Sequence, residues 1–244
     1  MTSISVVIPA LNDAALLRSC LAALALQSRR AHEIIVVDNG SVDATVEVAQ
    51  VAGALVLRQP VRGIFAASAL GYDAATGDII ARLDADSVPA ADWIATIERE
   101  LGRAPSLSAI SGPARFYGGN RFWRWFGATV YVPGYYSLMR LLTGHAAVFG
   151  SNFAMHREVW AGVRSSVHLD DPELHDDMDL SLQLLPEMTV LYVPALTVSV
   201  SARPFASVGA MAKRIRWGRR TMALGAAERS YRGRRSDYRR LHPR

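Results

Sequence analysis

The sequence has little cysteine and lacks long apolar runs. Its 244 residues include one cysteine, Cys20, so no disulfide can form within the chain, which fits a reducing compartment. No run of about 18 uncharged apolar residues predicts a membrane-spanning helix. The opening MTSISVVIPALND has no basic region followed by a long apolar stretch, so we expect no signal peptide and a cytoplasmic location.

Two nucleotide-binding motifs are also missing near the N-terminus. No G-x-G-x-x-G follows the first predicted strand, which argues against a nicotinamide-dependent oxidoreductase. The segment IPALND does not supply the glycine-rich phosphate loop that nucleotidyl transfer on a related α/β sheet would need.

The net charge of +5 hides an asymmetry along the chain. Residues 213–244 carry a net charge of +10, and residues 1–212 carry −5. A basic tail over 213–244 that follows an acidic segment over 1–212 predicts a local anionic partner such as lipid headgroups. We expect this contact at the cytoplasmic face of a membrane and expect no binding to nucleic acid. Beyond Ala226 the tail is polar and is expected to be poorly ordered. The alternative is a non-catalytic module that binds anionic lipid or nucleic acid through this tail.

Strand and helix patterns alternate through the first half of the chain. Apolar β-branched runs predict buried strands, and apolar stripes with helical spacing separate them. The predicted strands are 3–9, 33–38, 54–57 and 79–83, and the predicted helices are 14–27, 43–52, 64–76 and 93–101. This repetition predicts an α/β fold with a mostly parallel central sheet and helices on both faces.

Acidic side chains follow two of these strands. Asp38 ends the second strand, and Asp84 and Asp86 follow the fourth; Asn12 lies in the loop after the first. Ligands bind beyond the carboxyl ends of the strands in open α/β sheets, so we expect these side chains to lie along one rim.

The pair Asp84 and Asp86 predicts a cation site. In an extended segment residues i and i+2 face the same way, and two neighbouring carboxylates make each other's ionisation costly. A divalent cation removes that cost, and carboxylate oxygens together with substrate phosphates suit Mg²⁺ or Mn²⁺. The alternative is a structural turn, because Asp and Ser before Pro often end a strand.

The second half of the chain changes character. Residues 107–112 and 146–155 resemble strands, and Pro194 interrupts the strand-like segment 189–200. Residues 116–142 are dense in aromatic and basic side chains. This segment fits a membrane interface, an apolar acceptor cleft or ordinary core packed over the sheet.

Five ordered segments resemble family 2 glycosyltransferases. They are SVVIPALND (5–13), EIIVVDNGSVDAT (33–45), GIFAASALGYDAATGDIIARLDADS (63–87), GSNFAMHREVW (150–160) and HDDMDLSLQL (175–184). The resemblance implies the GT-A nucleotide-sugar-binding fold and an inverting, metal-dependent transfer of a sugar to a glycan or lipid-linked acceptor. It further implies a catalytic domain over 1–204, with a nucleotide-binding half (1–112) and an acceptor half (113–204), followed by a basic helix and tail over 205–244.

The resemblance also implies roles for individual residues. Asp86, with Asp84, would hold Mn²⁺ or Mg²⁺. Asp177 would be the catalytic base, in a helix that opens near Asp176 and ends near Leu185; the alternative is a structural helix with an acidic first turn. The implied nucleotide-sugar-binding residues are Pro9, Asn12, Asp38, Arg62, Asp84, Ala85, Gly150, Ser151 and Asp176. Asp38 as a helix cap, and Gly150–Ser151 as a plain strand turn, remain open alternatives.

Two departures from the family pattern matter. Ser68–Ala69 stand where Arg-Asn is frequent, so Arg62 or another arginine would have to replace a phosphate contact. In KRIRW (213–217), Lys213 replaces the Gln of the Gln-x-x-Arg-Trp motif of processive relatives, which predicts a non-processive enzyme. Lys213, Arg214 or Arg216 would still be near enough to reach a diphosphate; the alternative is a solvated helix face.

Overall fold

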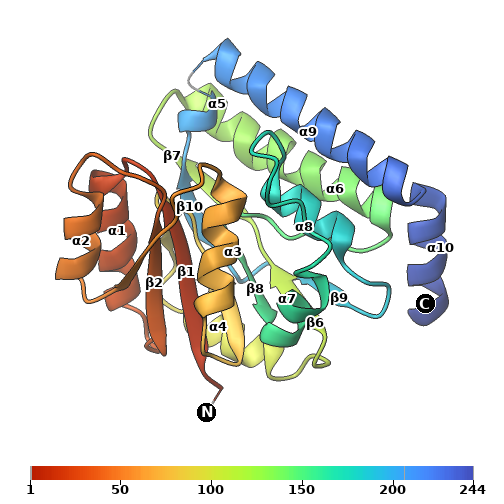
Figure 1. The fold of residues 1–244 in the computed structure, drawn as a ribbon, viewed down its shortest axis with the longest axis horizontal. Helices are drawn as coiled ribbons and strands as arrows, with labels where there is room; N and C mark the ends of the chain where they lie inside the picture. Colours follow the sequence, from red (N-terminus) through yellow and green to blue (C-terminus); the bar gives the residue numbers. More distant parts are fainter. Residues whose placement is uncertain (1, 206, 244) are drawn as a thin grey trace.

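The computed structural model describes residues 2–205 and 207–243. A seven-stranded sheet forms the centre, in the order β3–β2–β1–β4–β8–β6–β9 (Figure 1). Strands β1 to β4 are parallel to one another, β8 is antiparallel to β4 and β6, and β9 is parallel to β6. The strands are β1 (Ile4–Ala10), β2 (Glu33–Asp38), β3 (Leu55–Arg58), β4 (Ile79–Arg82), β6 (Ser108–Ser111), β8 (Phe153–His156) and β9 (Thr189–Tyr192).

A smaller three-stranded sheet lies beside it, in the order β5–β10–β7. Its strands are β5 (Val88–Pro89), β7 (Ala114–Tyr117) and β10 (Val198–Ser201). The predicted strand-like segment 189–200 therefore divides around Pro194, with β9 in the large sheet and β10 in the small one.

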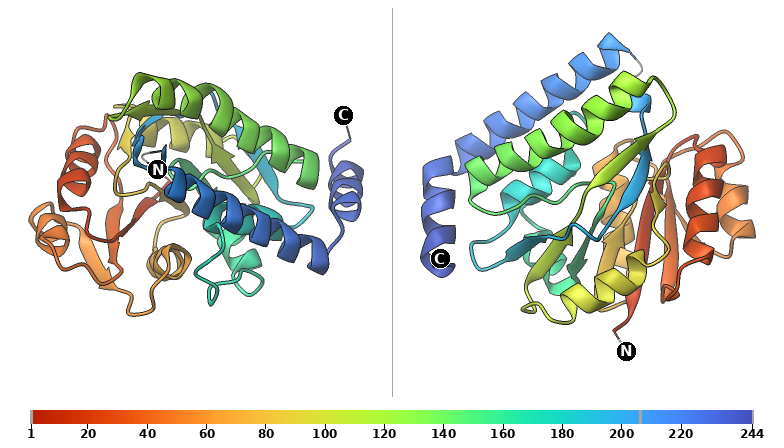
Figure 2. Two further views of the ribbon diagram at one scale, coloured as in Figure 1. Left: turned by 90° about the horizontal axis from the view of Figure 1, so that it is seen from above. Right: turned by 180° about the vertical axis from the view of Figure 1, so that it is seen from behind.

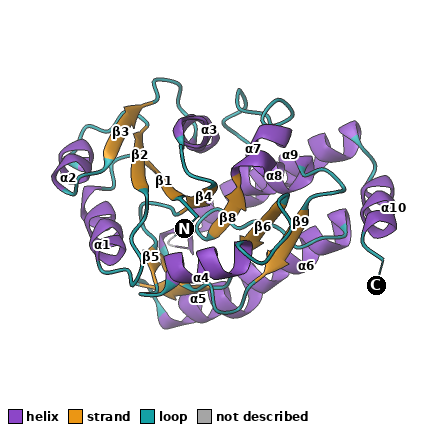
Figure 3. Cartoon of the chain, turned by 90° about the horizontal axis from the view of Figure 1, so that it is seen from below, coloured by secondary structure: helices purple, strands orange, loops and turns teal. Residues whose placement is uncertain are grey.

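Helices cover both faces of the large sheet and bury its inner strands, whereas the edge strands β3 and β9 are partly exposed (Figure 3). Ile4, Val6 and Ile8 of β1 pack into one core with α1 (Ala14–Ala25), α2 (Thr45–Val51) and α4 (Trp93–Leu101). Val7 faces the other core, with α3 (Ile64–Ala74), α7 (Arg157–Val163) and α8 (Asp176–Gln183). The predicted α/β fold with a mostly parallel central sheet is confirmed.

The ends of the predicted helices shift by a few residues. The helix predicted from Asp43 begins at Thr45. Its N-cap residue is Ala44, and no side chain makes a capping hydrogen bond there. Asp43 still shapes this turn, because its Oδ1 accepts a hydrogen bond from the Thr45 N–H at 3.0 Å.

The aromatic segment folds into one long helix with a wide turn in its middle. Helix α5 (Arg121–Phe126) runs into a π-helical segment (Gly127–Tyr131) and then α6 (Val132–Thr143). Pro133, at the start of α6, has no N–H to donate to the preceding turn, a common cause of such irregularity. Gly127 is required here, because a Cβ would lie 2.6 Å from the Phe116 ring.

The basic tail is helical, which corrects the prediction that it is poorly ordered beyond Ala226. After a short 3₁₀ turn (Arg203–Phe205), α9 (Val208–Glu228) packs on α8, and α10 (Tyr231–Leu241) packs on α6 (Figure 2). Arg234 helps to hold the two helices, because it is buried and donates hydrogen bonds to the carbonyl oxygens of Leu182 and Gly225. Among the described residues, no helix is long and apolar enough to cross a membrane.

Candidate active site

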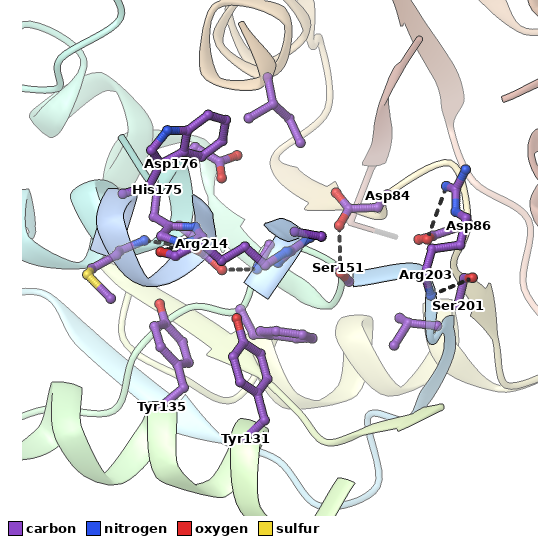
Figure 4. A pocket seen from close by; sticks show the side chains of 18 of the residues that line it. Asp84, Asp86, Tyr131, Tyr135, Ser151, His175, Asp176, Ser201, Arg203 and Arg214 are labelled. Carbon is purple, nitrogen blue, oxygen red and sulfur yellow. Dashed lines mark hydrogen bonds and ion pairs between the residues drawn. The ribbon is translucent and has the colours of Figure 1, made fainter. Parts of the chain in front are cut away.

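A cavity of about 480 Å³ opens at the carboxyl end of β4, between the sheet, α6 and α9 (Figure 4). Carboxylates from two elements line it: Asp84 and Asp86 after β4, and Asp176 and Asp177 at the start of α8. Asp84 and Asp86 therefore lie on the predicted rim, because the parallel strands deliver their carboxyl ends to one edge of the sheet, whereas Asp38 and Asn12 do not line this cavity.

A buried arginine joins the two acidic groups. Arg82 ends β4 and its side chain is only 2% exposed. Its Nη2 lies 2.9 Å from Asp84 Oδ1, and its Nη1 pairs with Asp176 Oδ2. Burial works to lower the pKa of Arg82, but the attraction of Asp176 and Asp84 outweighs burial and the pKa is raised, so the guanidinium stays charged.

Sequence reasoning assigned no role to Arg82. The signal was present, because a charged residue within an otherwise apolar buried strand needs a partner. The i and i+2 spacing identifies Asp84 as one partner, whereas Asp176 lies 94 residues further along the chain.

Asp84 and Asp86 both line the cavity but hold different partners. Asp84 Oδ2 accepts a hydrogen bond from Ser151 Oγ at 2.6 Å, and Asp86 Oδ2 lies 3.3 Å from Arg203 Nη2. Burial, reinforced by repulsion from Asp84, raises the pKa of Asp86 to about 6. An ionised Asp86 is therefore costly in the absence of a cation.

This pair of carboxylates fits a divalent cation by the chemistry of its oxygens and by the unfavourable charge on Asp86. Within 2–205 and 207–243, no cluster of three or more His, Cys, Asp or Glu side chains is arranged around one point. A cation there would depend on oxygens from the substrate or water for its remaining ligands.

Asp177 lies at the first turn of α8, facing Gly150. Its Oδ2 accepts a hydrogen bond from the Gly150 N–H at 3.0 Å, and its Oδ1 accepts one from the Met178 N–H at 2.8 Å. Burial, followed by repulsion from Asp176, raises the pKa of Asp177. A carboxylate of raised pKa is a better proton acceptor at neutral pH than an exposed one.

Gly150 and Ser151 bridge the two acidic groups. A Cβ on Gly150 would lie 3.4 Å from Asp177 Oδ2 and 3.5 Å from Arg82 Nη2. The absence of a side chain at Gly150 therefore leaves space between Asp177 and Arg82. The Ser151 hydroxyl orients Asp84 from the same loop.

The residues expected at the nucleoside end divide into two groups. Pro9 and Ala85 line a smaller hollow of about 270 Å³ that shares Asp84 and Asp86 with the main cavity. Asp38 instead accepts a hydrogen bond from the Ser41 N–H at 3.0 Å, and the Asn12 side chain accepts one from the Val42 N–H at 2.8 Å. Both side chains therefore hold the backbone of the loop after β2, and Asn12 itself has the left-handed φ of +53°.

Arg62 lies before α3 beside Gly40, on the exposed side of the loop, and lines neither hollow. An unpredicted arginine, Arg203, is the one that reaches Asp86. Nothing in the local pattern of Arg203 indicated this contact, because Asp86 is 117 residues away in sequence.

Helix α9 supplies the basic wall of the cavity. Lys213, Arg214 and Trp217 line it, and the Lys213 Nζ lies 4.4 Å from the centre of the Trp217 ring. His175 holds this helix in place, because its backbone N–H donates a hydrogen bond to Thr221 Oγ1 at 3.0 Å. Arg216 points away and lies 3.9 Å from Glu173, as expected for a solvated face.

Comparison with known proteins identifies the family. Residues 5–162 match the model of Glycosyl transferase family 2. The chain belongs to glycosyl transferase family 2. The family resemblance stated from the motifs is confirmed.

Curated relatives in the family match only in part. The PGL/p-HBAD biosynthesis glycosyltransferase of Mycobacterium tuberculosis is 32% identical over 131 residues, which are 51% of this chain and 50% of the relative. Glycosyltransferase AglE of Haloferax volcanii is 33% identical over 99 residues, 37% of this chain and 33% of the relative. The chain thus spans about half the length, or less, of the curated relatives it matches.

Solved structures share the fold. Glucosyl-3-phosphoglycerate synthase from Mycobacterium tuberculosis, in complex with Mn²⁺, UDP and glucosyl-3-phosphoglycerate, superposes with a TM-score of 0.68 at 22% identity, covering 93% of this chain and 80% of that one. The same synthase with Mn²⁺, UDP-glucose and phosphoglyceric acid gives a TM-score of 0.66 at 23% identity, covering 93% and 79%. These likenesses confirm the GT-A-type fold.

Proposed function

We propose that this chain is an inverting glycosyltransferase that moves a sugar from a nucleoside diphosphate to an acceptor hydroxyl with the help of a divalent cation. One observation carries the proposal: Asp84 and Asp86 on one side, and Asp177 on another element, line a single cavity. Metal-binding carboxylates and a proton acceptor of raised pKa are the two acidic functions that such a transfer needs.

Asp86 and Asp84 would hold Mn²⁺ or Mg²⁺, which when bound supplies positive charge beside the departing diphosphate. Arg203, Lys213 and Arg214 line the same cavity and add positive charge from the protein. Ser151 keeps the Asp84 carboxylate oriented, and Arg82 fixes the distance between Asp84 and Asp176.

Asp177 acts on the acceptor. Its carboxylate takes the proton of the acceptor hydroxyl, whose oxygen forms a bond to the anomeric carbon of the sugar. The bond from that carbon to the diphosphate breaks, and its electron pair leaves with the nucleoside diphosphate. Attack from the side opposite the leaving group inverts the anomeric centre.

UDP-glucose is the first donor to test, because the synthase of the same fold is solved with it. Pro9 and Ala85 would contact the nucleoside; Asp38 and Asn12 would act through the loops that they hold. Arg62 would have to move to reach a phosphate. A non-processive reaction is supported by Lys213 in place of glutamine.

We also propose that the enzyme acts at an anionic membrane surface. Exposed arginines on α10, together with Phe122 and Trp125 exposed on α5, support attachment to lipid headgroups.

Two substitutions test the catalytic proposal. Asp86→Ala should abolish Mn²⁺-dependent binding of UDP, whereas Asp177→Asn should leave that binding intact and lower the rate of sugar transfer about 10²- to 10⁴-fold. Calorimetric titration with UDP, with and without Mn²⁺, and release of UDP from UDP-glucose provide the two readouts. Full activity of Asp177→Asn would exclude Asp177 as the base. Binding of lipid without any UDP binding would favour the non-catalytic module.

A further inference from the structure

Aromatic side chains form one wall of the cavity. Phe116 of β7, Tyr131 of the π-helical segment and Phe205 of the 3₁₀ turn line it, with the Phe205 ring centre 5.2 Å from that of Phe116 and 5.4 Å from that of Tyr131. Tyr131 of the π-helical segment and Tyr135 of α6 point into the cavity, across from Asp84 and Asp176 (Figure 4). A molecule lying between the acidic and aromatic walls would meet both.

This wall offers few hydrogen bonds. Phe116, Phe149 and Phe205 have no polar side-chain atom, and the Tyr135 hydroxyl already donates to the Val148 carbonyl oxygen at 2.8 Å. A glycan against such a wall would lose water from hydroxyls that find no new hydrogen-bond partner, which is unfavourable. An apolar group gains from the same contact.

The aromatic surface continues outward from the cavity. Phe205 stacks on Trp123 of α5, with ring centres 6.1 Å apart and planes 6° apart, and Phe126 lies 6.0 Å from Phe205. Phe122 and Trp125 follow on the same short helix and are 55% and 57% exposed. Exposed aromatic groups continuous with a cavity mark a binding surface for apolar matter.

We infer that the acceptor is an amphiphile, whose hydroxyl lies at Asp177 and whose alkyl chain lies on Phe116, Tyr131 and Phe205 and leaves the protein over α5. This inference rests on the proposed transfer reaction and names the class of its acceptor. The exposed Arg121 beside the aromatic groups of α5 suits the headgroup region where such an amphiphile resides.

A series of n-alkyl β-D-glucosides tests the inference, using ethyl, butyl, hexyl and octyl chains below their micelle concentrations. The protein is first saturated with UDP and Mn²⁺, and the Kd of each glucoside is measured by calorimetry. Each added methylene should lower Kd about two- to fourfold, because each buried methylene is transferred from water to an apolar wall. Ethyl glucoside, glucose and phosphoglyceric acid should bind far more weakly than octyl glucoside.

A pair of variants locates the chain. Tyr131→Ser should flatten the dependence of Kd on chain length, whereas Tyr192→Ser, a half-exposed tyrosine outside the cavity, should leave it unchanged. If Tyr131→Ser does not fold, a photoreactive octyl glucoside applied to the unaltered protein should label residues 116–131 or 203–205. Labelling elsewhere would overturn the inference.

The two proposals fail differently. A Kd that does not change with chain length, or a phosphoglyceric acid Kd below that of octyl glucoside, would overturn the amphiphilic acceptor while UDP still binds. Absence of Mn²⁺-dependent UDP binding in the saturation step would overturn the glycosyl transfer itself.

Discussion

The guanidinium of Arg203 contacts two acidic side chains at once, Asp13 Oδ1 at 2.6 Å and Asp86 Oδ2 at 3.3 Å. Arg203 follows β10, and Asp13 immediately precedes α1, so the contact joins distant parts of the chain at the rim of the cavity. The Arg203 side chain is 53% exposed and that of Asp86 is 14% exposed, so water screens the guanidinium and weakens the pair towards the range of about 0.2–1 kcal/mol that is typical of exposed ion pairs. Arg203 can therefore exchange Asp86 for a bound phosphate at little cost.

Replacing Arg203 should affect a metal ion and a nucleotide in opposite directions. In Arg203→Gln, Mn²⁺ alone should bind about 1.5- to 5-fold more tightly, because the competing guanidinium is gone from Asp86. UDP in the presence of Mn²⁺ should bind more weakly, because a positive charge near the diphosphate is lost. Calorimetric titrations measure both, with the exposed Arg115→Gln as control. A change of the same sign for both ligands would contradict this exchange.

Asp86 should make the stability of the metal-free protein depend on pH. Its pKa is about 6 in the fold against an ordinary 3.8, so the protonated carboxyl favours the fold. That contribution is fully present below pH 3.8 and is lost as the pH rises through 6. In EDTA, Asp86→Asn should therefore be more stable than the unaltered protein at pH 8, by at most about 3 kcal/mol. The difference should vanish near pH 4, as followed by urea unfolding; an equal difference at both pH values would refute it.

Binding of Mn²⁺ should depend on the same group. Protons compete with the metal for Asp86, so the affinity for Mn²⁺ should fall about tenfold for each pH unit below 6 and level off above 7. Electron paramagnetic resonance of free Mn²⁺ measures this affinity directly. An affinity that does not change between pH 5 and 7 would remove Asp86 from the ligands.

Replacing Arg82 should lower the free energy of unfolding strongly. Arg82→Met leaves the buried Asp176 and the partly buried Asp84 without their shared partner, and loss of one member of a buried pair typically costs about 3–5 kcal/mol. The double variant Arg82→Met/Asp176→Asn should recover part of this loss. Urea unfolding measures both free energies, and Arg121→Met, on the exposed surface of α5, should change stability by less than about 0.5 kcal/mol. A loss of similar size for Arg121→Met would contradict the special role of Arg82.

Three exposed arginines of α10 test the membrane proposal without removing the helix. Replacing Arg232, Arg239 and Arg240 by Ser leaves the buried Arg234 in place. Each lost charge near an anionic leaflet should cost about 1 kcal/mol, so binding to phosphatidylserine vesicles should weaken about 100-fold. The same change at Arg18, Arg30 and Arg103, which are exposed on α1, the loop after it and the end of α4, is the control. Equal weakening by both triple variants would mean that only net charge matters.

The sequence predicted the parts of the structure that local patterns determine. The strands that end at Asp38 and Arg82 lie where their apolar composition predicted them, since buried parallel strands are nearly continuous apolar runs. The pairings of Arg82 with Asp176 and of Arg203 with Asp86 were not predictable. Each joins residues about 100 positions apart, and the local sequence around one residue does not indicate the other.

The order of the tail escaped prediction for a related reason. An arginine-rich composition usually indicates a solvated segment, and α10 satisfies this expectation on its outer face. One of its arginines, Arg234, instead reaches carbonyl oxygens of two other helices. Buried contacts of this kind hold a segment whose composition alone would predict a solvated chain.

The wide turn before Pro133 decides which way α5 faces. A π turn holds one residue more than an α turn, and one residue corresponds to about 100° of rotation around a helix. Had the segment been regular, the side chains of residues 121–126 would be rotated by that angle relative to α6. The π-helical turn thus sets the direction in which Trp123 and Trp125 of α5 point relative to α6.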